Sequence, residues 1–177
     1  MKVAFFGAFD PAYRRNVVLR EGLEALGVEV ARIAVAPGTP MFVRDAALLV
    51  RWAASAASLD ALLVPAFGHR DVPLAAALGR VSGLPVVFDP LVSRWDTQVG
   101  DLGRAGARSL AAWRLRASDR IALSLADLVL CDTWEHGDFF STEYGVPRSK
   151  LCRVPVYRKS TRLNSSHQST SRMPSSA

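Results

Sequence analysis

Polar and charged side chains follow the short apolar runs of this sequence, where a ligand site could form. After residues 3–6 comes a segment that contains Gly7 and the candidate contacts Asp10, Tyr13, Arg14 and Asn16. Glycine lets the backbone approach a ligand, and the N–H groups of a following helix attract anions. An ordinary turn punctuated by Asp10 and Pro11 accounts for the same residues. The segment has neither a G-x-G-x-x-G pattern nor a Walker lysine, which disfavours a standard dinucleotide or P-loop site.

Two further apolar runs, residues 62–64 and 85–88, lead into His69 and Asp89. A carboxylate at the end of a strand can act as a general base on a hydroxyl, so Asp89 is the candidate catalytic residue. Capping of the following turn is the alternative role for Asp89. His69 is a candidate ligand contact or proton shuttle, or else a plain surface histidine. The segment after Asp89 contains three further candidate residues for the ligand site: Ser93, Arg94 and Asp96.

A fourth run, residues 128–131, leads into Thr133 and His136, which are also candidates for the cleft. Capping of the next helix is the simpler explanation for Thr133. The two cysteines, Cys131 and Cys152, each lie inside an apolar run and show no metal-ligand spacing. We therefore expect free thiols, no metal site and no cofactor.

Strands and helices are predicted to alternate along the chain. Apolar runs predict strands at residues 3–6, 28–35, 62–64, 85–88, 128–131 and 151–154. The predicted helices run from a cap at Asn16 to Gly27, from a cap at Asp45 to about residue 58, and over 72–81, 108–125 and 133–144, while 89–106 is predicted as a loop. This alternation predicts an α/β fold, a Rossmann-like doubly wound, mostly parallel sheet with helices on both faces. Ligands bind outside the carboxyl ends of such strands, so the candidate residues should converge there.

Charge is distributed unevenly along the 177 residues. The formal charge is +6, but residues 157–177 contain four basic and no acidic residues, which leaves only two of these charges for residues 1–156. A nucleic-acid partner is therefore disfavoured.

The N-terminal apolar run is too short for a signal peptide, and no apolar stretch is long enough for a membrane span. We expect a cytoplasmic protein. Arginines interleaved with Leu110 and Trp113 in the 108–125 helix indicate either a solvated face or peripheral contact with the inner membrane face.

The composition changes at Tyr157. Residues 157–177 contain seven serines, two threonines and few apolar residues, and 158–167 closely resemble a translated sequencing adapter. We expect one domain over residues 1–156, followed by a disordered, non-native tail. A natural basic tail is the alternative.

The order of motifs in residues 1–156 resembles the N-terminal domain of the family 4 glycosyltransferases, which have GT-B architecture. The resemblance rests on the strand that opens into the Gly7 loop, on PVVFDP at 85–90, and on ADLVLCDT at 126–133, YGVP at 144–147 and KLCRVPV at 150–156. It implies an enzyme that transfers a sugar from an activated donor, commonly a nucleotide sugar, to a sugar or lipid-linked acceptor. In that family the acceptor lies mostly on the N-terminal domain and the donor mostly on a C-terminal domain, which does not follow here.

The resemblance also assigns roles to single residues. Gly7 would approach the donor phosphates, whereas Asp89 falls where many members have a histidine, which puts proton handling at that position in doubt. The resemblance implies that residues 1–156 are inactive without the donor-binding domain. Two alternatives remain open: a stand-alone Rossmann-like ligand-binding domain, and a fragment of a GT-B sugar-nucleotide epimerase or phosphorylase. A receiver domain is disfavoured because the third strand ends in Pro65, Ala66 and Phe67 rather than in an aspartate.

Overall fold

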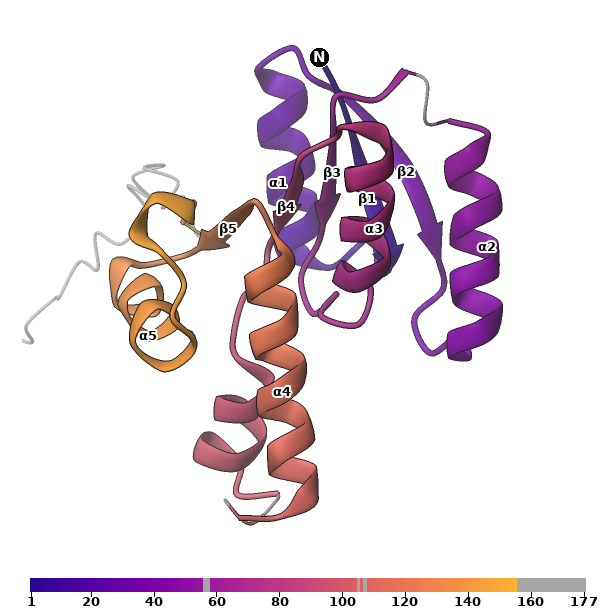
Figure 1. Cartoon of the computed structure of the whole chain (residues 1–177). Helices are drawn as coiled ribbons and strands as arrows, with labels where there is room; N and C mark the ends of the chain where they lie inside the picture. The colour runs from indigo at the N-terminus through magenta and orange to yellow at the C-terminus, as the bar shows by residue number, and fades with distance from the viewer. Residues whose placement is uncertain (56–57, 105, 107, 156–177) are drawn as a thin grey trace, which may run out of the picture.

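One six-stranded sheet forms the centre of the molecule. The computed structural model describes residues 1–55, 58–104, 106 and 108–155. The strands are β1 (Lys2–Ala8), β2 (Glu29–Val35), β3 (Ala61–Val64), β4 (Val86–Phe88), β5 (Leu128–Cys131) and β6 (Leu151–Arg153). Their order is β2-β1-β3-β4-β5-β6, and every neighbouring pair is parallel (Figure 1). The predicted Rossmann-like α/β fold is confirmed.

Five α-helices connect the strands: α1 (Arg14–Ala25), α2 (Met41–Ala53), α3 (Val72–Ser82), α4 (Leu110–Leu125) and α5 (Trp134–Tyr144). Several predicted helix ends are confirmed. The Thr133 hydroxyl accepts a hydrogen bond from the His136 N–H at 3.2 Å and caps α5. Gly83 and Gly145 end α3 and α5 in the left-handed conformation that glycine adopts without strain.

Two predicted helix caps are wrong. The α1 helix begins at Arg14, and Asn16 lies in its first turn, where the side-chain amide bonds to other segments. The α2 helix begins at Met41, because the Pro40 carbonyl accepts a hydrogen bond from the Arg44 N–H at 2.9 Å. Asp45 therefore lies inside α2.

The segment predicted as a loop before α4 is also partly helical. A π-helical segment spans Asp96–Asp101, and α4 begins only at Leu110, after its cap Ser109. The Ser109 hydroxyl accepts a hydrogen bond from the Ala112 N–H at 3.1 Å. The glycines and polar residues of this segment indicated a loop. The sequence does not show how the segment packs beside α4, so its helical part was not predicted.

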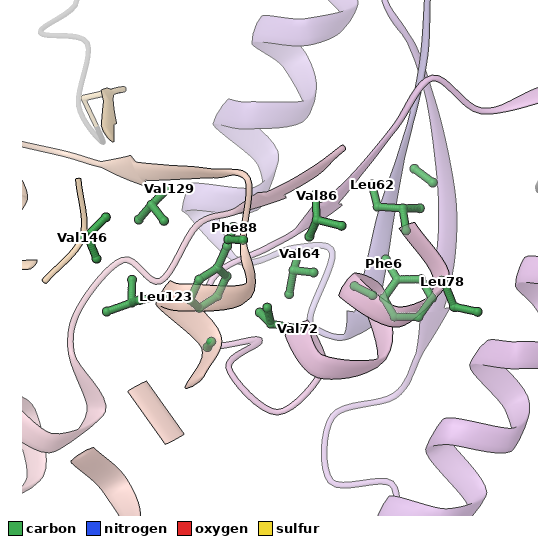
Figure 2. Close-up of a cluster of buried hydrophobic side chains, with 14 of the residues drawn as sticks. Phe6, Leu62, Val64, Val72, Leu78, Val86, Phe88, Leu123, Val129 and Val146 are labelled. Atoms are coloured by element: carbon green, nitrogen blue, oxygen red, sulfur yellow. The ribbon is translucent and has the colours of Figure 1, made fainter. Parts of the chain in front are cut away.

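The two faces of the sheet are covered unequally. Along β1, Ala4 and Phe6 face a core that also contains buried residues of α2, α3, α4 and α5 (Figure 2). Val3 and Phe5 face the opposite way, toward a smaller core that includes Leu19 of α1. The chain turns in opposite directions along the sheet after β1 and after β2, and right-handed crossovers then put α1 opposite the other helices.

The strand order also determines where a crevice forms. The chain leaves β1 toward β2 at one side and returns to β3 at the other, so the connections diverge at the carboxyl ends of β1 and β3. Such a switch point is where open parallel sheets bind ligands. The N-terminal half of α4 projects beyond the same edge (Figure 1).

The predicted tail at 157–177 lies outside the described residues. In the part of the chain that the structure describes, no helix is both long enough and apolar enough to cross a membrane.

Candidate functional site

Two adjacent hollows flank the switch point between β1 and β3, and both are lined by Ala8, Pro37 and Phe67. The larger, about 470 Å³, is here called the basic pocket because its wall includes Arg44, Arg70 and Arg94. The smaller, about 200 Å³, is called the aromatic pocket, and its wall includes Phe9, Asp10, Tyr13, Asn16 and Ala66. Together they form a cleft at the edge where the sequence predicted one.

Gly7 precedes Ala8, which lines both pockets, and lies close to Asp71 of the basic pocket. Its φ of 131° is one that side chains rarely adopt, and a Cβ atom there would lie only 2.6 Å from Asp71 Oδ2. The same Asp71 oxygen accepts a hydrogen bond from the Ala8 N–H at 2.9 Å. Burial raises the pKa of Asp71, while the Ala8 N–H and the Arg44 guanidinium oppose that shift. The glycine is therefore needed for contact between protein segments, whatever it contributes to a ligand.

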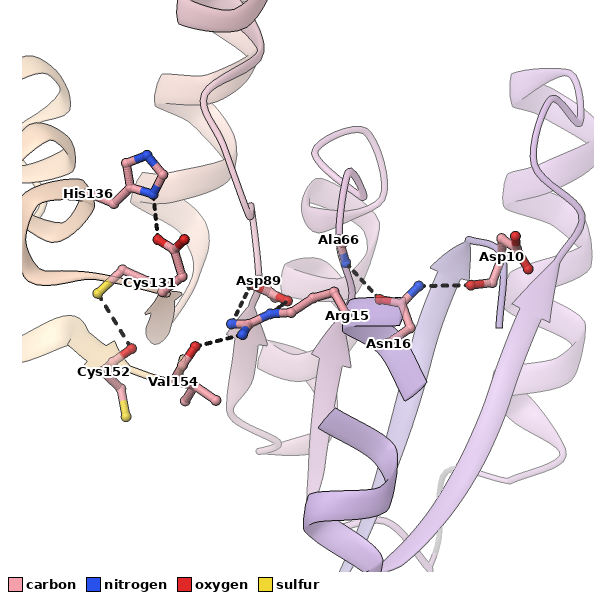
Figure 3. Close-up of polar contacts among 10 residues, drawn as sticks. Asp10, Arg15, Asn16, Ala66, Asp89, Cys131, His136, Cys152 and Val154 are labelled. Carbon is pink, nitrogen blue, oxygen red and sulfur yellow. Dashed lines mark hydrogen bonds and ion pairs between the residues drawn. The ribbon is translucent and has the colours of Figure 1, made fainter. Parts of the chain in front are cut away.

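The predicted contacts after β1 have different surroundings. Asn16 is buried, and its amide donates to the Asp10 carbonyl at 2.9 Å and accepts from the Ala66 N–H at 3.3 Å (Figure 3). The Tyr13 ring packs edge-on against Phe67, with ring centres 5.4 Å apart. Arg14 is exposed. Asp10 and Tyr13 are thus available to a ligand, whereas Asn16 holds the loop in shape.

Asp89 lies inside the protein and does not face either pocket. Its side chain is 0% exposed, and its two oxygens pair with Arg15 Nε at 2.7 Å and Arg15 Nη2 at 3.2 Å. Arg15 Nη1 also donates to the Val154 carbonyl at 2.6 Å (Figure 3). Burial raises the pKa of Asp89, against the effect of Arg15. A carboxylate held in this way favours a structural role over action on a substrate hydroxyl.

His69 is not a surface residue, and it lines neither of the two pockets of the cleft. Its ring packs edge-on against Phe88 and is 2% exposed, with Nε2 3.5 Å from Asp119 Oδ1. Desolvation lowers the pKa of His69 to about 4, although Asp119 opposes the shift. The imidazole is therefore neutral at neutral pH.

Asp119 is the centre of a buried polar cluster behind the cleft. Its Oδ2 accepts hydrogen bonds from Ser93 Oγ at 2.7 Å, the Trp95 N–H at 2.9 Å and the Tyr144 hydroxyl at 3.2 Å. Burial of the Tyr144 hydroxyl is the main reason that its pKa is raised. The hydroxyl of the candidate Ser93 makes its hydrogen bonds within this cluster, since it also accepts one from the Asp96 N–H at 3.0 Å. It is therefore not available to a ligand.

The remaining candidates separate into two places. Arg94 is half-buried and faces the basic pocket. Thr133, by contrast, caps α5 beyond β5, and His136 Nδ1 lies 2.5 Å from Asp132 Oδ1. Burial raises the pKa of Asp96, and the nearby His136 opposes that rise. The structure therefore does not bring all the predicted residues into one site.

Five charged residues of this edge were not among the predicted site residues: Arg15, Arg44, Arg70, Asp71 and Asp119. A signal existed for one of them, since Asp119 follows Ala112 by seven residues and precedes Ala122 by three, which is the spacing of one helix face. Arg15 pairs with Asp89 and Arg44 pairs with Asp71, both far away in the sequence, and local patterns carry no information on such pairing. Arg70 has no ion-pair partner among the described residues, and nothing in its local sequence marks it.

Within the described ranges, no three or more His, Cys, Asp or Glu side chains are grouped so that they could hold a metal ion. The thiols of Cys131 and Cys152 are free. Comparison of the chain with protein-family models and with curated proteins gave no match.

A structural role for Asp89 has a measurable consequence. We expect Asp89→Ala to lower the free energy of unfolding by about 3–5 kcal/mol, because the Arg15 charge would remain buried without a partner. Chemical denaturation of the variant measures this change. Glu143→Ala, which breaks the exposed pair with Arg116, is the control and should cost no more than about 1 kcal/mol. Unchanged stability of Asp89→Ala would contradict the structural role.

Burial of neutral His69 predicts a pH dependence of stability. The unfolded chain binds a proton at the usual pKa of 6.5, whereas the folded chain does so only near 4. The free energy of unfolding should therefore fall by about 3 kcal/mol as the pH decreases through this window. Denaturation at several pH values should show that His69→Gln flattens the slope and that the control His136→Gln does not. An equal slope in the His69 variant would refute the assignment.

Proposed function

We propose that residues 1–156 form the acceptor-side domain of a family 4 glycosyltransferase of GT-B architecture. The observation that carries the proposal is the cleft at the β1–β3 switch point, which combines aromatic rings with polar and basic side chains. Ligand pockets are commonly concave sites of about 300–1,000 Å³ with a few convergent polar groups. A cleft of this size and composition fits a polyhydroxylated acceptor.

The order of motifs supports the same family. Asp127, from the first of the closing motifs, accepts a hydrogen bond from the Val86 N–H at 2.8 Å and links β5 to β4. Lys150, from the last motif, donates to the Ala126 carbonyl at 2.9 Å. These residues stabilise the β4–β6 side of the sheet. They are therefore evidence for a shared fold, and the assignment of sugar transfer rests on the resemblance together with the cleft.

The residues of the aromatic pocket have plain roles in this proposal. The rings of Tyr13 and Phe67 offer apolar faces against which the C–H side of a sugar can pack. The Tyr13 hydroxyl and the Asp10 carboxylate can bind acceptor hydroxyl groups. The donor, a nucleotide sugar, would bind mainly to a second domain across the cleft.

The proposal predicts a division of labour between this chain and a second domain. We expect the chain of 177 residues to transfer no sugar from UDP-, GDP- or ADP-linked donors, because in this proposal the donor binds mainly to a second domain. The natural reading frame beyond the Val156 codon, recovered from genomic DNA, should encode a second α/β domain of about 180 residues. The protein made from that frame should release nucleoside diphosphate from one of these donors.

Two results would contradict this proposal. Sugar transfer by the 177-residue chain would show that no second domain is needed. A natural frame that ends with residues 158–177 would remove the transferase assignment and favour a stand-alone binding domain. The two results come from independent measurements.

Peripheral contact with an anionic membrane is part of the same proposal. Phe42 at the start of α2 is 82% exposed and Trp113 near the start of α4 is 66% exposed. Both helices begin at the carboxyl edge of the sheet, and Arg108 and Arg114 flank Trp113. Exposed aromatic residues beside arginines are typical of surfaces that bind anionic lipid.

The membrane contact predicts binding to vesicles. The chain should float with phosphatidylglycerol vesicles and not with phosphatidylcholine vesicles. The double variant Phe42→Ser/Trp113→Ser should lose most of this binding. Leu26→Ser, which changes an exposed residue after α1 at the opposite edge of the sheet, is the control. Equal flotation of the double variant and the unchanged chain would exclude this surface as the contact.

A further inference from the structure

We propose that the basic pocket binds a phosphate ester, through Arg70, Arg94 and the first turn of α2. As a statement about the acceptor, this inference rests on the proposed function, and it assigns that acceptor to the class of phosphorylated polyols or lipids. As a statement about an anion site, it stands on the geometry of the pocket alone.

The first observation is the arrangement of charge. Arg44 is paired, with Nε 3.2 Å from Asp71 Oδ1 and 3.0 Å from Asp45 Oδ1. Neither Arg70 nor Arg94 forms an ion pair with any described residue of the chain. Asp71 is the acid in the wall of this pocket, and its oxygens are already engaged by Arg44 and the Ala8 N–H. Two guanidinium groups therefore remain available to one hollow.

The second observation is that these two cations line the same pocket, near enough for their charges to repel. Arg94 is half-buried, and both its desolvation and the nearby Arg70 lower the pKa of its guanidinium, while Asp119 opposes them. Two like charges of which one is half-buried repel each other, and an anion between them would offset that repulsion. Guanidinium groups bind phosphate oxygens through paired, charge-assisted hydrogen bonds, which matches this arrangement.

The third observation is the helix that opens at the pocket. Pro40 and Met41, the cap and first residue of the 13-residue α2, line the basic pocket. No side chain caps this end, and its first turn contains no acidic residue. The free N–H groups and the positive end of the helix dipole thus face the same hollow as the two arginines. The volume of about 470 Å³ leaves room for a sugar-sized group beside a phosphate.

Binding of inorganic phosphate to the chain of 177 residues tests the site. Isothermal titration at neutral pH and low ionic strength should show saturable binding. Arg70→Ala and Arg94→Ala should each weaken that binding by about 10-fold or more, since each removes a charge-assisted contact. Arg70 is exposed and has no structural partner among the described residues, so its variant keeps the fold, which circular dichroism checks.

Two controls separate this pocket from general positive charge. Arg114→Ala removes an exposed charge on α4, and Arg162→Ala removes one from the C-terminal segment. Both should bind phosphate as the unchanged chain does. The proposal is overturned by the absence of saturable binding, or by equal weakening in all four variants.

A second arm identifies the source of the phosphate. Phosphatidylcholine vesicles containing phosphatidic acid should retain the chain if the phosphate belongs to a lipid, and inorganic phosphate or Arg70→Ala should then release it. If the vesicles do not retain the chain while phosphate binding persists, the ligand is a soluble phosphate ester. No sugar donor is present in either arm. A failed phosphate titration therefore leaves the glycosyltransferase test standing, and a failed transferase test leaves this site standing.

Discussion

The buried guanidinium of Arg15 is the contact on which the carboxyl edge of the sheet depends. It joins the first turn of α1 to Asp89 after β4 and to the Val154 carbonyl after β6. Burying one charge alone would be very unfavourable, but two carboxylate oxygens and a carbonyl saturate most of its donors. Because α1 is held from this turn, Asn16 is positioned to bind the Asp10 carbonyl and the Ala66 N–H, which define the aromatic pocket.

This anchoring separates the polar groups of the edge into two kinds. The first kind bonds to other groups of the protein: Arg15, Asn16, Asp71, Asp89, Ser93 and Asp119. The second kind has no such side-chain partner among the described residues and lines the pockets: Arg70, Arg94, Tyr13 and the first N–H groups of α2. Proximity to a strand end is therefore a weak sign of function by itself. What distinguishes a ligand contact is a polar group that the fold leaves without an internal partner.

The sequence predicted what local chemistry controls and missed what distant contacts control. Apolar runs identified all six strands, and Thr133, Gly83 and Gly145 correctly marked helix ends, because these signals act over a few residues. Arg15 and Asp89 are 74 residues apart, and no local pattern shows that they pair. Asn16 and Asp45 were misread as caps for a related reason. Both have the side chain of a capping residue, but the helix start was fixed upstream by Tyr13 and Pro40 carbonyls.

The distribution of carboxylates limits what chemistry this domain can perform alone. Asp89 is buried and paired with Arg15, and Asp71 is bound by the Ala8 N–H and Arg44. Among the residues that line the two pockets, this leaves Asp10 as the exposed carboxylate, and Oδ1 of Asp10 accepts from the Ala12 N–H at 2.8 Å. His69 is too buried to exchange protons with a ligand in the cleft. The cleft is therefore better equipped to hold and orient a ligand than to activate it, and positively charged groups dominate its larger pocket. An enzyme built on this edge would need the reacting groups for sugar transfer to come from the donor itself or from the segment that binds it.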